Sequence, residues 1–134
     1  MPGIIDVEGI GKAYKSKLAK VNIFTTDALL DTGATPRGRK LLAEKTGISE
    51  ALILEWVNLA DLYRIKGVGS EYSDLLEEVG VDTVVELSIR VSKNLYEKMV
   101  EINGNQKLVR KLPSETQIAD WINQAKKLDR KVKY

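Results

Sequence analysis

The sequence predicts an all-α protein: two tandem repeats of about four helices each, packed as one compact helical domain. Three observations support this expectation: an internal repeat, apolar residues at helical spacing, and capping residues at the ends of the apolar segments. The chain has 134 residues, of which 43% are hydrophobic and 30% charged. That length suits one domain or two half-size units sharing a core, and the composition is typical of globular proteins.

The internal repeat sets the domain organisation. At an offset of 58 residues, positions 7–29 align with 65–87 and give seven identities in 23 pairs. Downstream the offset becomes 65, and Ser49, Trp56 and Asn58 pair with Ser114, Trp121 and Asn123. The difference between the two offsets predicts a seven-residue insertion in the second repeat. We place it around residues 103–106, a polar segment whose composition predicts a turn. We expect repeats at residues 1–62 and 63–128, followed by a basic tail at 129–134.

Apolar spacing and capping residues delimit the helices of the first repeat. Tyr14, Leu18 and Val21 share one helical face, which predicts a helix over residues 12–21. Helix-start and helix-stop residues predict three more helices: Thr25 to Gly33, Thr35-Pro36 to Gly47, and Ser49 to about Arg64.

The second repeat follows the same plan with two informative differences. Asn22 of the first repeat stands where Gly80 stands in the second, and both tolerate the left-handed conformation of a helix C-cap. Val81 to Val85 is β-branched, but the matching residues 23–27 are not strand-like, so we expect a turn and a helix start there. A last helix is predicted over residues 114–128.

Composition excludes most catalytic chemistry. The chain contains neither cysteine nor histidine, which excludes disulfides, zinc, haem and iron–sulfur sites and the common nucleophile–histidine pairs. We therefore expect no enzyme activity and no cofactor. The carboxylates of Asp6, Glu8, Asp27 and Asp31 are not spaced as a calcium loop, so no metal site is expected. The sequence shows no leader-like start and no long apolar run, and we expect a cytoplasmic protein without a membrane span.

Each repeat begins with a short glycine pattern that precedes a helix. The pattern is an apolar residue, any residue, Gly, an apolar residue and Gly, and it occurs at residues 7–11 and 65–69. It resembles the helix-hairpin-helix motif of DNA repair, recombination and replication proteins. That resemblance implies a tight turn at the glycines, an apolar wedge between helices, and backbone N–H groups that hold a DNA phosphate. The implied binding residues are Gly9, Ile10, Gly11, Lys12 and Lys15 in the first repeat and Gly67, Val68, Gly69 and Ser70 in the second.

Nearly the whole chain shares a wider resemblance. With its Glu55-Trp56-Val57-Asn58 and Asp120-Trp121-Ile122-Asn123 segments, it resembles the bacterial domain-of-unknown-function 4332 family of helix-hairpin-helix-like repeats, over about residues 5–128. This resemblance implies the fold and carries no established activity. The 58-residue separation of the hairpins is longer than in the compact double unit of DNA-repair enzymes, which argues against one symmetric DNA footprint.

Charge distinguishes the two hairpins. The helix after Gly11 carries four lysines and no acid, whereas the helix after Gly69 carries Glu71, Asp74, Glu77 and Glu78 and no base. The net charge is only +2, so any attraction for nucleic acid has to be local. We expect the first hairpin to bind phosphate, with a plain solvated lysine face as the alternative. The acidic second repeat suits a basic protein partner. Arg37 and Arg39 form a further basic cluster, and the basic tail is either a phosphate-tracking arm or a solubilising end.

Two functions follow as hypotheses. The first is non-enzymatic, sequence-independent binding of nucleic acid, double-stranded DNA in the leading version, through backbone–phosphate contacts. The second is a protein-interaction or assembly adaptor in which the hairpins are only structural. Under either hypothesis Trp56 and Trp121 are core anchors rather than base-stacking residues, and Tyr14 and Tyr72 point inward with hydroxyls that reach backbone groups.

The ends of the chain suggest a closure. Only eight residues precede Gly9, whereas the helix over residues 114–128 has no following hairpin. We therefore expect this helix to pack beside the first hairpin, with Ile118, Trp121, Ile122 and Ala125 against Ile5, Val7, Ile10 and Leu18. Such closure is possible within one chain or by exchange between two, giving a monomer or an exchanged dimer.

Overall fold

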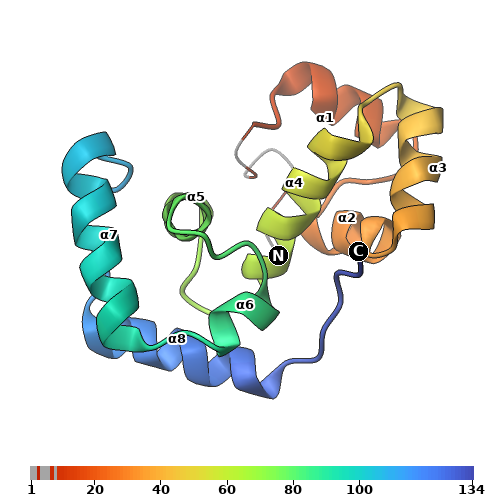
Figure 1. Cartoon of the computed structure of the whole chain (residues 1–134). Coiled ribbons are helices and arrows are strands. Elements are labelled where there is room, and N and C mark those ends of the chain that lie inside the picture. The colour runs from red at the N-terminus through yellow and green to blue at the C-terminus, as the bar shows by residue number, and fades with distance from the viewer. Residues whose placement is uncertain (1–2, 4–6, 8) are drawn as a thin grey trace. The chain divides into compact units, whose positions relative to one another are not determined.

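The computed structural model describes Gly3, Val7 and residues 9–134 (Figure 1). In these residues the chain is helical, and the only β-type pairing is an isolated bridge between Gly3 and Thr25, so the predicted all-α class is confirmed. The helices are α1 (Lys12–Ala19), α2 (Thr26–Gly33), α3 (Pro36–Thr46), α4 (Glu50–Leu62), α5 (Ser70–Glu78), α6 (Val84–Ser88), α7 (Ser92–Gln106) and α8 (Glu115–Lys127).

The chain divides into two compact units. Unit 1 comprises the residues up to Asp61 together with Lys131–Tyr134, and unit 2 comprises Leu62–Arg130. Unit 1 therefore contains α1 to α3 and nearly all of α4, and unit 2 contains α5 to α8. The chain passes between the units twice, near the end of α4 and again after Arg130.

Side-chain caps begin the helices where the sequence predicts them. The hydroxyls of Thr25 and Thr35 accept hydrogen bonds from the backbone N–H groups of Ala28 and Gly38, each at 3.1 Å. In unit 2, the hydroxyl of Thr83 caps α6 by accepting from the N–H of Glu86 at 3.4 Å. The hydroxyl of Ser114 caps α8 by accepting from the N–H of Gln117 at 3.0 Å. Each cap satisfies a first-turn donor that the helix itself leaves unpaired.

The equivalent positions Asn22 and Gly80 have the left-handed backbone that the sequence predicts. Asn22 has φ 63° and Gly80 has φ 90°, so both adopt the left-handed conformation shortly after α1 and α5. The β-branched run after Gly80 forms no strand, because α6 begins at Val84. Both expectations are confirmed.

The segment 103–106 is helical, so the prediction of a turn there is wrong. These residues form the last turn of α7, which ends at Lys107 with φ 52°. The side chain of Asn103 accepts a hydrogen bond from the N–H of Val109 at 3.0 Å and donates one to its carbonyl at 3.3 Å. Polar residues that usually favour turns here fasten the following loop to the helix end.

A tryptophan lies at the centre of each unit. In unit 1, Trp56 of α4 is fully buried, and its ring centroid lies 5.0 Å from that of Tyr14 in an edge-on arrangement. In unit 2, Trp121 of α8 is 1% exposed and lies 5.3 Å from Tyr72. Both tryptophans are core anchors, as the sequence predicts.

The predicted closure around the first hairpin is wrong. Trp121 belongs to the core of unit 2, where its cluster includes Val68, Leu75 and Leu76, and α8 packs against α6 and α7. The tryptophans of α4 and α8 therefore each lie against the hairpin of their own unit. The physical reason is that Ile118, Ile122 and Ala125 of α8 are buried in the core of unit 2, which places the Trp121 indole against Gly67. Ile5, which we expected in that contact, lies outside the described residues.

Candidate functional site

The two hairpins, Gly9–Gly11 and Gly67–Gly69, share one local geometry. Their first glycines have φ 89° and 100°, a conformation that favours glycine. A Cβ added to Gly9 would lie 3.3 Å from Nε1 of Trp56, and one added to Gly67 would lie 3.0 Å from Nε1 of Trp121. The first glycine of each hairpin is thus required both by the turn and by the tryptophan beneath it.

The apolar residue between the glycines is buried in both hairpins. Ile10 is 4% exposed and Val68 is 6% exposed. Their backbone N–H groups donate to the carbonyls of Val7 and Ile65, each at 3.1 Å, which closes the turn. These two residues anchor the hairpins and are not accessible to a ligand.

The second glycine of each hairpin is open to solvent. Gly11 and Gly69 have extended backbones, with φ −91° and −106°, that any residue adopts. A Cβ at either position would meet no atom within 4 Å. These glycines are the N-caps of α1 and α5, and glycine has no side chain with which to cap the first helical turn. Each hairpin therefore presents an accessible helix N-terminus.

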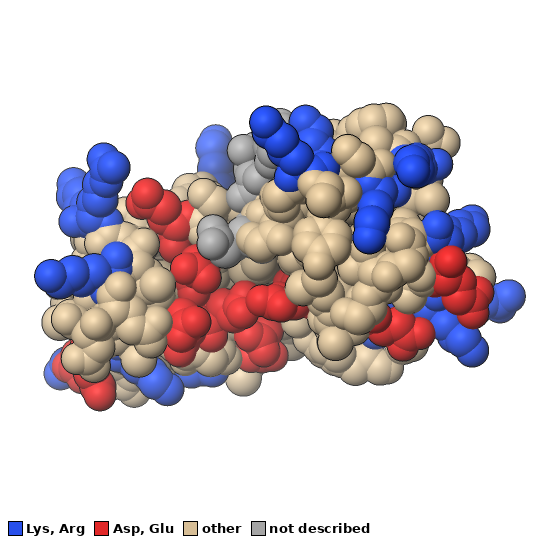
Figure 2. Space-filling view, turned by 90° about the horizontal axis from the view of Figure 1, so that it is seen from above, with Lys and Arg blue, Asp and Glu red and all other residues tan. Residues whose placement is uncertain are grey.

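Charge separates these two otherwise similar sites. Lys12 and Lys15 are exposed on α1, and Lys17 places its ammonium 5.7 Å from the ring centre of Tyr14. On α5, Glu71 and Glu78 are exposed. Figure 2 shows acidic side chains gathered where α5 lies. The same backbone geometry is thus followed by a lysine-bearing helix at α1 and by an acidic helix at α5.

Side chains of unit 2 form hydrogen bonds to the backbone beside the second hairpin and near the start of α5. The side chain of Gln124 accepts from the N–H of Lys66 at 2.8 Å and donates to its carbonyl at 3.0 Å. The hydroxyl of Tyr72 donates to the carbonyl of Lys111 at 3.0 Å, as predicted for an inward tyrosine. Ser70 is exposed at the first position of α5, where its carbonyl accepts from the Ser73 hydroxyl.

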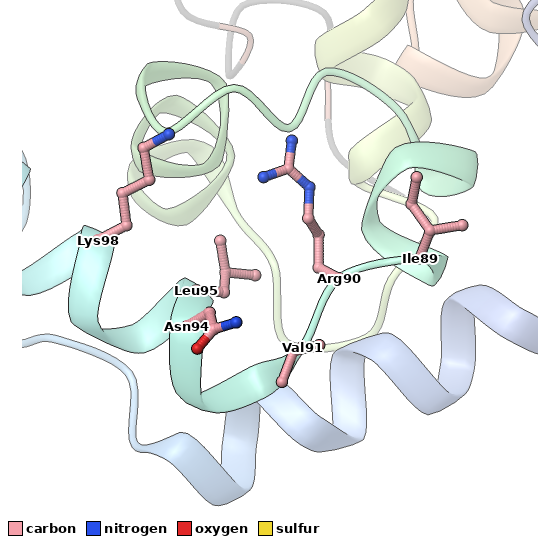
Figure 3. Close-up of a pocket in the computed structure, with 6 residues that line it drawn as sticks. All are labelled: Ile89, Arg90, Val91, Asn94, Leu95 and Lys98. Atoms are coloured by element: carbon pink, nitrogen blue, oxygen red, sulfur yellow. The ribbon is translucent and has the colours of Figure 1, made fainter.

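A further surface that the sequence interpretation missed lies between α6 and α7. Ile89 is 77% exposed and Val91 is 59% exposed. Together with Arg90, Asn94, Leu95 and Lys98 they line a pocket of about 280 Å³ (Figure 3). The available signal was an apolar residue directly before Ser92, at a position where helices usually begin with a polar cap.

The two arginines of the predicted basic cluster differ sharply. Arg37 is exposed. Arg39 is 6% exposed, and its guanidinium donates to the carbonyls of Gly33 at 2.9 Å and Lys133 at 2.8 Å. Burial lowers the pKa of Arg39 below its ordinary value, and attraction to Tyr134 and Glu50 partly opposes this. Arg39 therefore holds unit 1 together and is not part of an accessible phosphate site.

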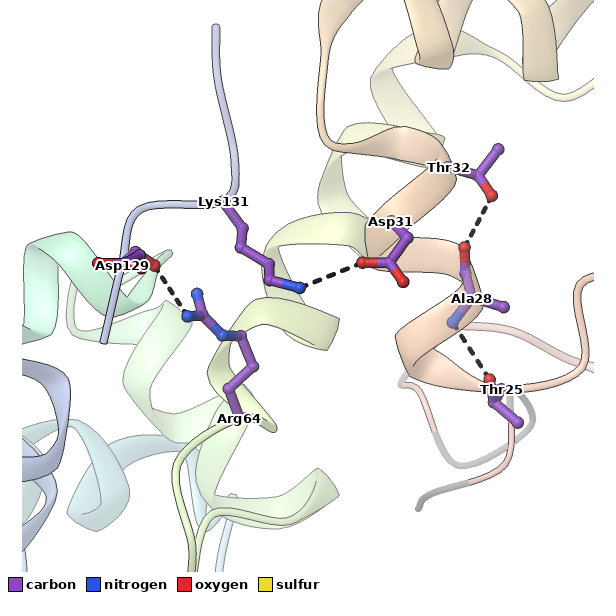
Figure 4. A network of polar contacts seen from close by, with 7 residues as sticks. All are labelled: Thr25, Ala28, Asp31, Thr32, Arg64, Asp129 and Lys131. Carbon is purple, nitrogen blue, oxygen red and sulfur yellow. Dashed lines mark hydrogen bonds and ion pairs between the residues drawn. The ribbon is translucent and has the colours of Figure 1, made fainter. Parts of the chain in front are cut away.

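The end of the chain contributes to this packing. The N–H of Lys133 donates to the carbonyl of Ala34 at 2.8 Å, and Val132 is 2% exposed. The Lys131 ammonium lies 3.2 Å from the carboxylate of Asp31, and Figure 4 draws this ion pair. The same figure shows Arg64 donating to the carbonyl of Asp129 at 2.8 Å within unit 2. Residues 131–134 thus pack on unit 1 instead of extending as an arm.

The described residues form neither a cluster for a metal ion nor a helix that could span a membrane. Among them, no three acidic side chains gather into a cluster that would hold a metal ion. No helix in this part of the chain has both the length and the apolar character needed to cross a bilayer. Asp6 and Glu8, two of the four carboxylates considered from the sequence, lie outside the described residues.

Comparison with known proteins identifies a family. No curated protein and no solved structure matches the chain. A family model, described as a domain of unknown function (DUF4332), matches residues 8–128. That span covers both hairpins, both tryptophans and all of the helices named above. The chain therefore belongs to the DUF4332 family.

Proposed function

We propose that the protein is a non-enzymatic, cytoplasmic module that binds nucleic acid, specifically double-stranded DNA, without sequence preference. The first hairpin is the binding element, in the manner of a helix-hairpin-helix motif. One observation carries the proposal: the N-terminus of α1 is accessible at Gly11, and the helix behind it carries exposed Lys12 and Lys15 and no acid.

The chemistry of this site suits a phosphate. Backbone N–H groups at the start of α1 point out of the helix, and the helix dipole favours a negative charge there. Because Gly11 has open space around it, a phosphate oxygen can approach the backbone closely. Lysine ammonium groups that contact phosphates also release the cations condensed on DNA, and this release makes binding stronger at low salt. None of these groups reads a base edge, so the binding is independent of sequence.

The second hairpin supports an asymmetric version of this proposal. Gly69 opens the N-terminus of α5 as Gly11 opens α1, but Glu71 stands in the first turn of α5. A carboxylate there already interacts favourably with the helix dipole and repels a phosphate. We therefore assign the nucleic-acid contact to the first hairpin, with Arg37 as an exposed basic side chain of the same unit.

The salt dependence of binding tests this function. Fluorescence anisotropy of a labelled DNA duplex is measured between about 50 and 200 mM salt, and a log–log slope steeper than about −2 is expected, which corresponds to about three or more phosphate contacts. A single-stranded DNA and an RNA duplex of the same length serve as comparison ligands. Absence of duplex binding at about 50 mM salt would contradict the proposal.

An adaptor role is the second candidate, and the charge of α5 favours it. Its acidic side chains follow the second hairpin with no base between Ser70 and Gly80. Such a face suits a basic protein partner through complementary charge. The duplex titration also separates these candidates, because an adaptor whose hairpins are only structural does not bind DNA with a steep salt slope.

A further inference from the structure

The surface between α6 and α7 continues onto α8. Arg90, which lines the pocket of about 280 Å³, also lines a second pocket of about 190 Å³ with Ser92, Ala119, Ile122, Asn123 and Lys126. We call these two adjoining pockets the Arg90 groove. All of its lining residues belong to unit 2, and none belongs to either hairpin.

The groove combines exposed apolar side chains with basic ones. Figure 3 shows Leu95 between Arg90 and Lys98, with Ile89 at the end of α6. Lys126 adds a third base, and no acidic residue lines either pocket. Across residues 62–130 acidic and basic residues are equal in number, so the groove is a local positive site on a balanced unit. A ligand that fits it has an apolar part and a negative charge.

The start of α7 breaks a local rule at this surface. Thr25, Thr35, Thr83 and Ser114 cap other helices, but the N-cap of α7 is Val91, which makes no side-chain cap. Valine is among the poorest N-caps, because it leaves first-turn N–H groups without a partner. Residues that violate local preference in this way are expected where function requires it.

Size and charge together select the kind of ligand. A pocket of about 280 Å³ is smaller than those that enclose whole drug-sized ligands, and it suits one large side chain. Carboxylates beside that side chain complement Lys98, Lys126 and the uncapped amides of α7, while Arg90, whose guanidinium donates to the carbonyl of Gly80 at 3.0 Å, adds its positive charge from a fixed position. We propose that the Arg90 groove docks a short segment of a partner protein in which an apolar anchor stands next to aspartate or glutamate.

A displayed peptide library identifies the preferred segment. Random nine-residue peptides on phage are selected against the full chain, and enriched sequences are expected to carry an apolar residue flanked by acids. The best sequence is then synthesised with a fluorescent label, and its affinity is measured by anisotropy. Enrichment of basic or purely polar peptides, or no enrichment, would overturn the proposal.

Two substitutions test whether the peptide binds in the groove. They are chosen so that a loss of binding cannot be explained by a loss of stability. Val91→Thr supplies the missing cap, so it raises the midpoint of thermal unfolding, yet it removes an apolar contact and weakens peptide binding by about tenfold. Val100→Ser removes a valine on α7 that is 43% exposed and lies outside the groove lining, and it leaves affinity unchanged.

Charge reversal completes the test. Lys98→Glu and Lys126→Glu are expected to weaken binding of the acidic peptide, while Lys127→Glu, exposed on α8 but not in the groove lining, serves as the matched control. Equal losses in all three variants would show only a general charge effect and overturn the site. Sedimentation of the free protein gives the last outcome: self-association that Val91→Thr abolishes would assign the groove to a second copy instead.

Discussion

At the scale of single residues, the two glycines of a hairpin do different work. Gly67 has φ 100° and lies over Trp121, so its lack of a side chain serves conformation and packing. Gly69 has an ordinary extended backbone with open space around it, so its lack of a side chain leaves the helix N-terminus accessible. The first glycine is structural, and the second is where we propose that a ligand approaches.

This division predicts that replacement by alanine lowers the free energy of unfolding more at the first glycine of a hairpin than at the second. Gly67→Ala forces a left-handed alanine against the indole and should lower the free energy of unfolding by about 1 to 2 kcal/mol from the backbone alone. Gly69→Ala should cost less, about 0.5 to 1 kcal/mol, because its Cβ meets nothing within 4 Å and only the preference of the N-cap position for glycine over alanine is lost. Urea unfolding of both variants measures the difference, and equal losses would refute the assignment.

Single residues also mark the limit of sequence interpretation. The caps at Thr25 and Thr83 and the left-handed Asn22 were predictable, because each depends on neighbours within a few positions. Arg39 was not predictable. The sequence displays its charge within a basic run, but its burial depends on the carbonyl of Lys133, which is 94 positions away.

At the scale of helices, glycine allows close packing in unit 1. A Cβ on Gly33 of α2 would lie 2.6 Å from Cγ2 of Val57 on α4. A Cβ on Gly38 of α3 would overlap the carbonyl oxygen of Thr32, a backbone atom that cannot move aside easily. The α2 and α3 helices therefore approach each other through a surface that has no room for a methyl group.

Alanine at this contact should be strongly destabilising. We expect Gly38→Ala to lower the free energy of unfolding by about 1 to 3 kcal/mol, as overpacking does elsewhere. The matched control is Gly104→Ala in α7, where a Cβ meets nothing, and it should stabilise the protein by about 0.5 to 1 kcal/mol. Thermal unfolding distinguishes the two, and a neutral Gly38→Ala would contradict the close packing.

Helix positions were largely predictable, but one boundary was not. Repeated caps and apolar spacing place α2, α3, α4 and α8 close to their observed limits. The composition of residues 103–106 favours a turn, yet they complete α7 because the Asn103 side chain bonds to the backbone of Val109. That bond depends on the path of the chain after the helix, which local composition does not contain.

At the scale of the whole molecule, each of the two units packs around its own tryptophan. Trp56 lies at Gly9 in unit 1, and Trp121 lies at Gly67 in unit 2. The order of the chain suggests that Trp56 would pack on the second hairpin instead, because α4 directly precedes that hairpin in the sequence. The pairing was not predictable from the repeat alone, since both tryptophans occupy equivalent positions and either hairpin offers a similar bare glycine.

Separate cores predict a localised response to damage. Trp121→Ala should lower the free energy of unfolding of unit 2 by about 3 to 5 kcal/mol, the usual result of emptying a buried tryptophan site. Hydrogen exchange followed by mass spectrometry should then show faster exchange in residues 62–130 than in residues up to Asp61. Equal acceleration throughout the chain would show one cooperative core instead.

The central claim, that the first hairpin holds a phosphate, is tested most directly by Gly11→Val and Gly69→Val. Both positions are helix N-caps with extended backbones and open space, so both changes should cost a similar small amount of stability through the poorer valine cap and leave the rest of the fold intact. Loss of one amide bond to a charged phosphate corresponds to about a tenfold weaker affinity. We predict this loss for duplex binding by Gly11→Val and a change below about twofold for Gly69→Val. Equal losses in the two variants, or none in either, would contradict the account.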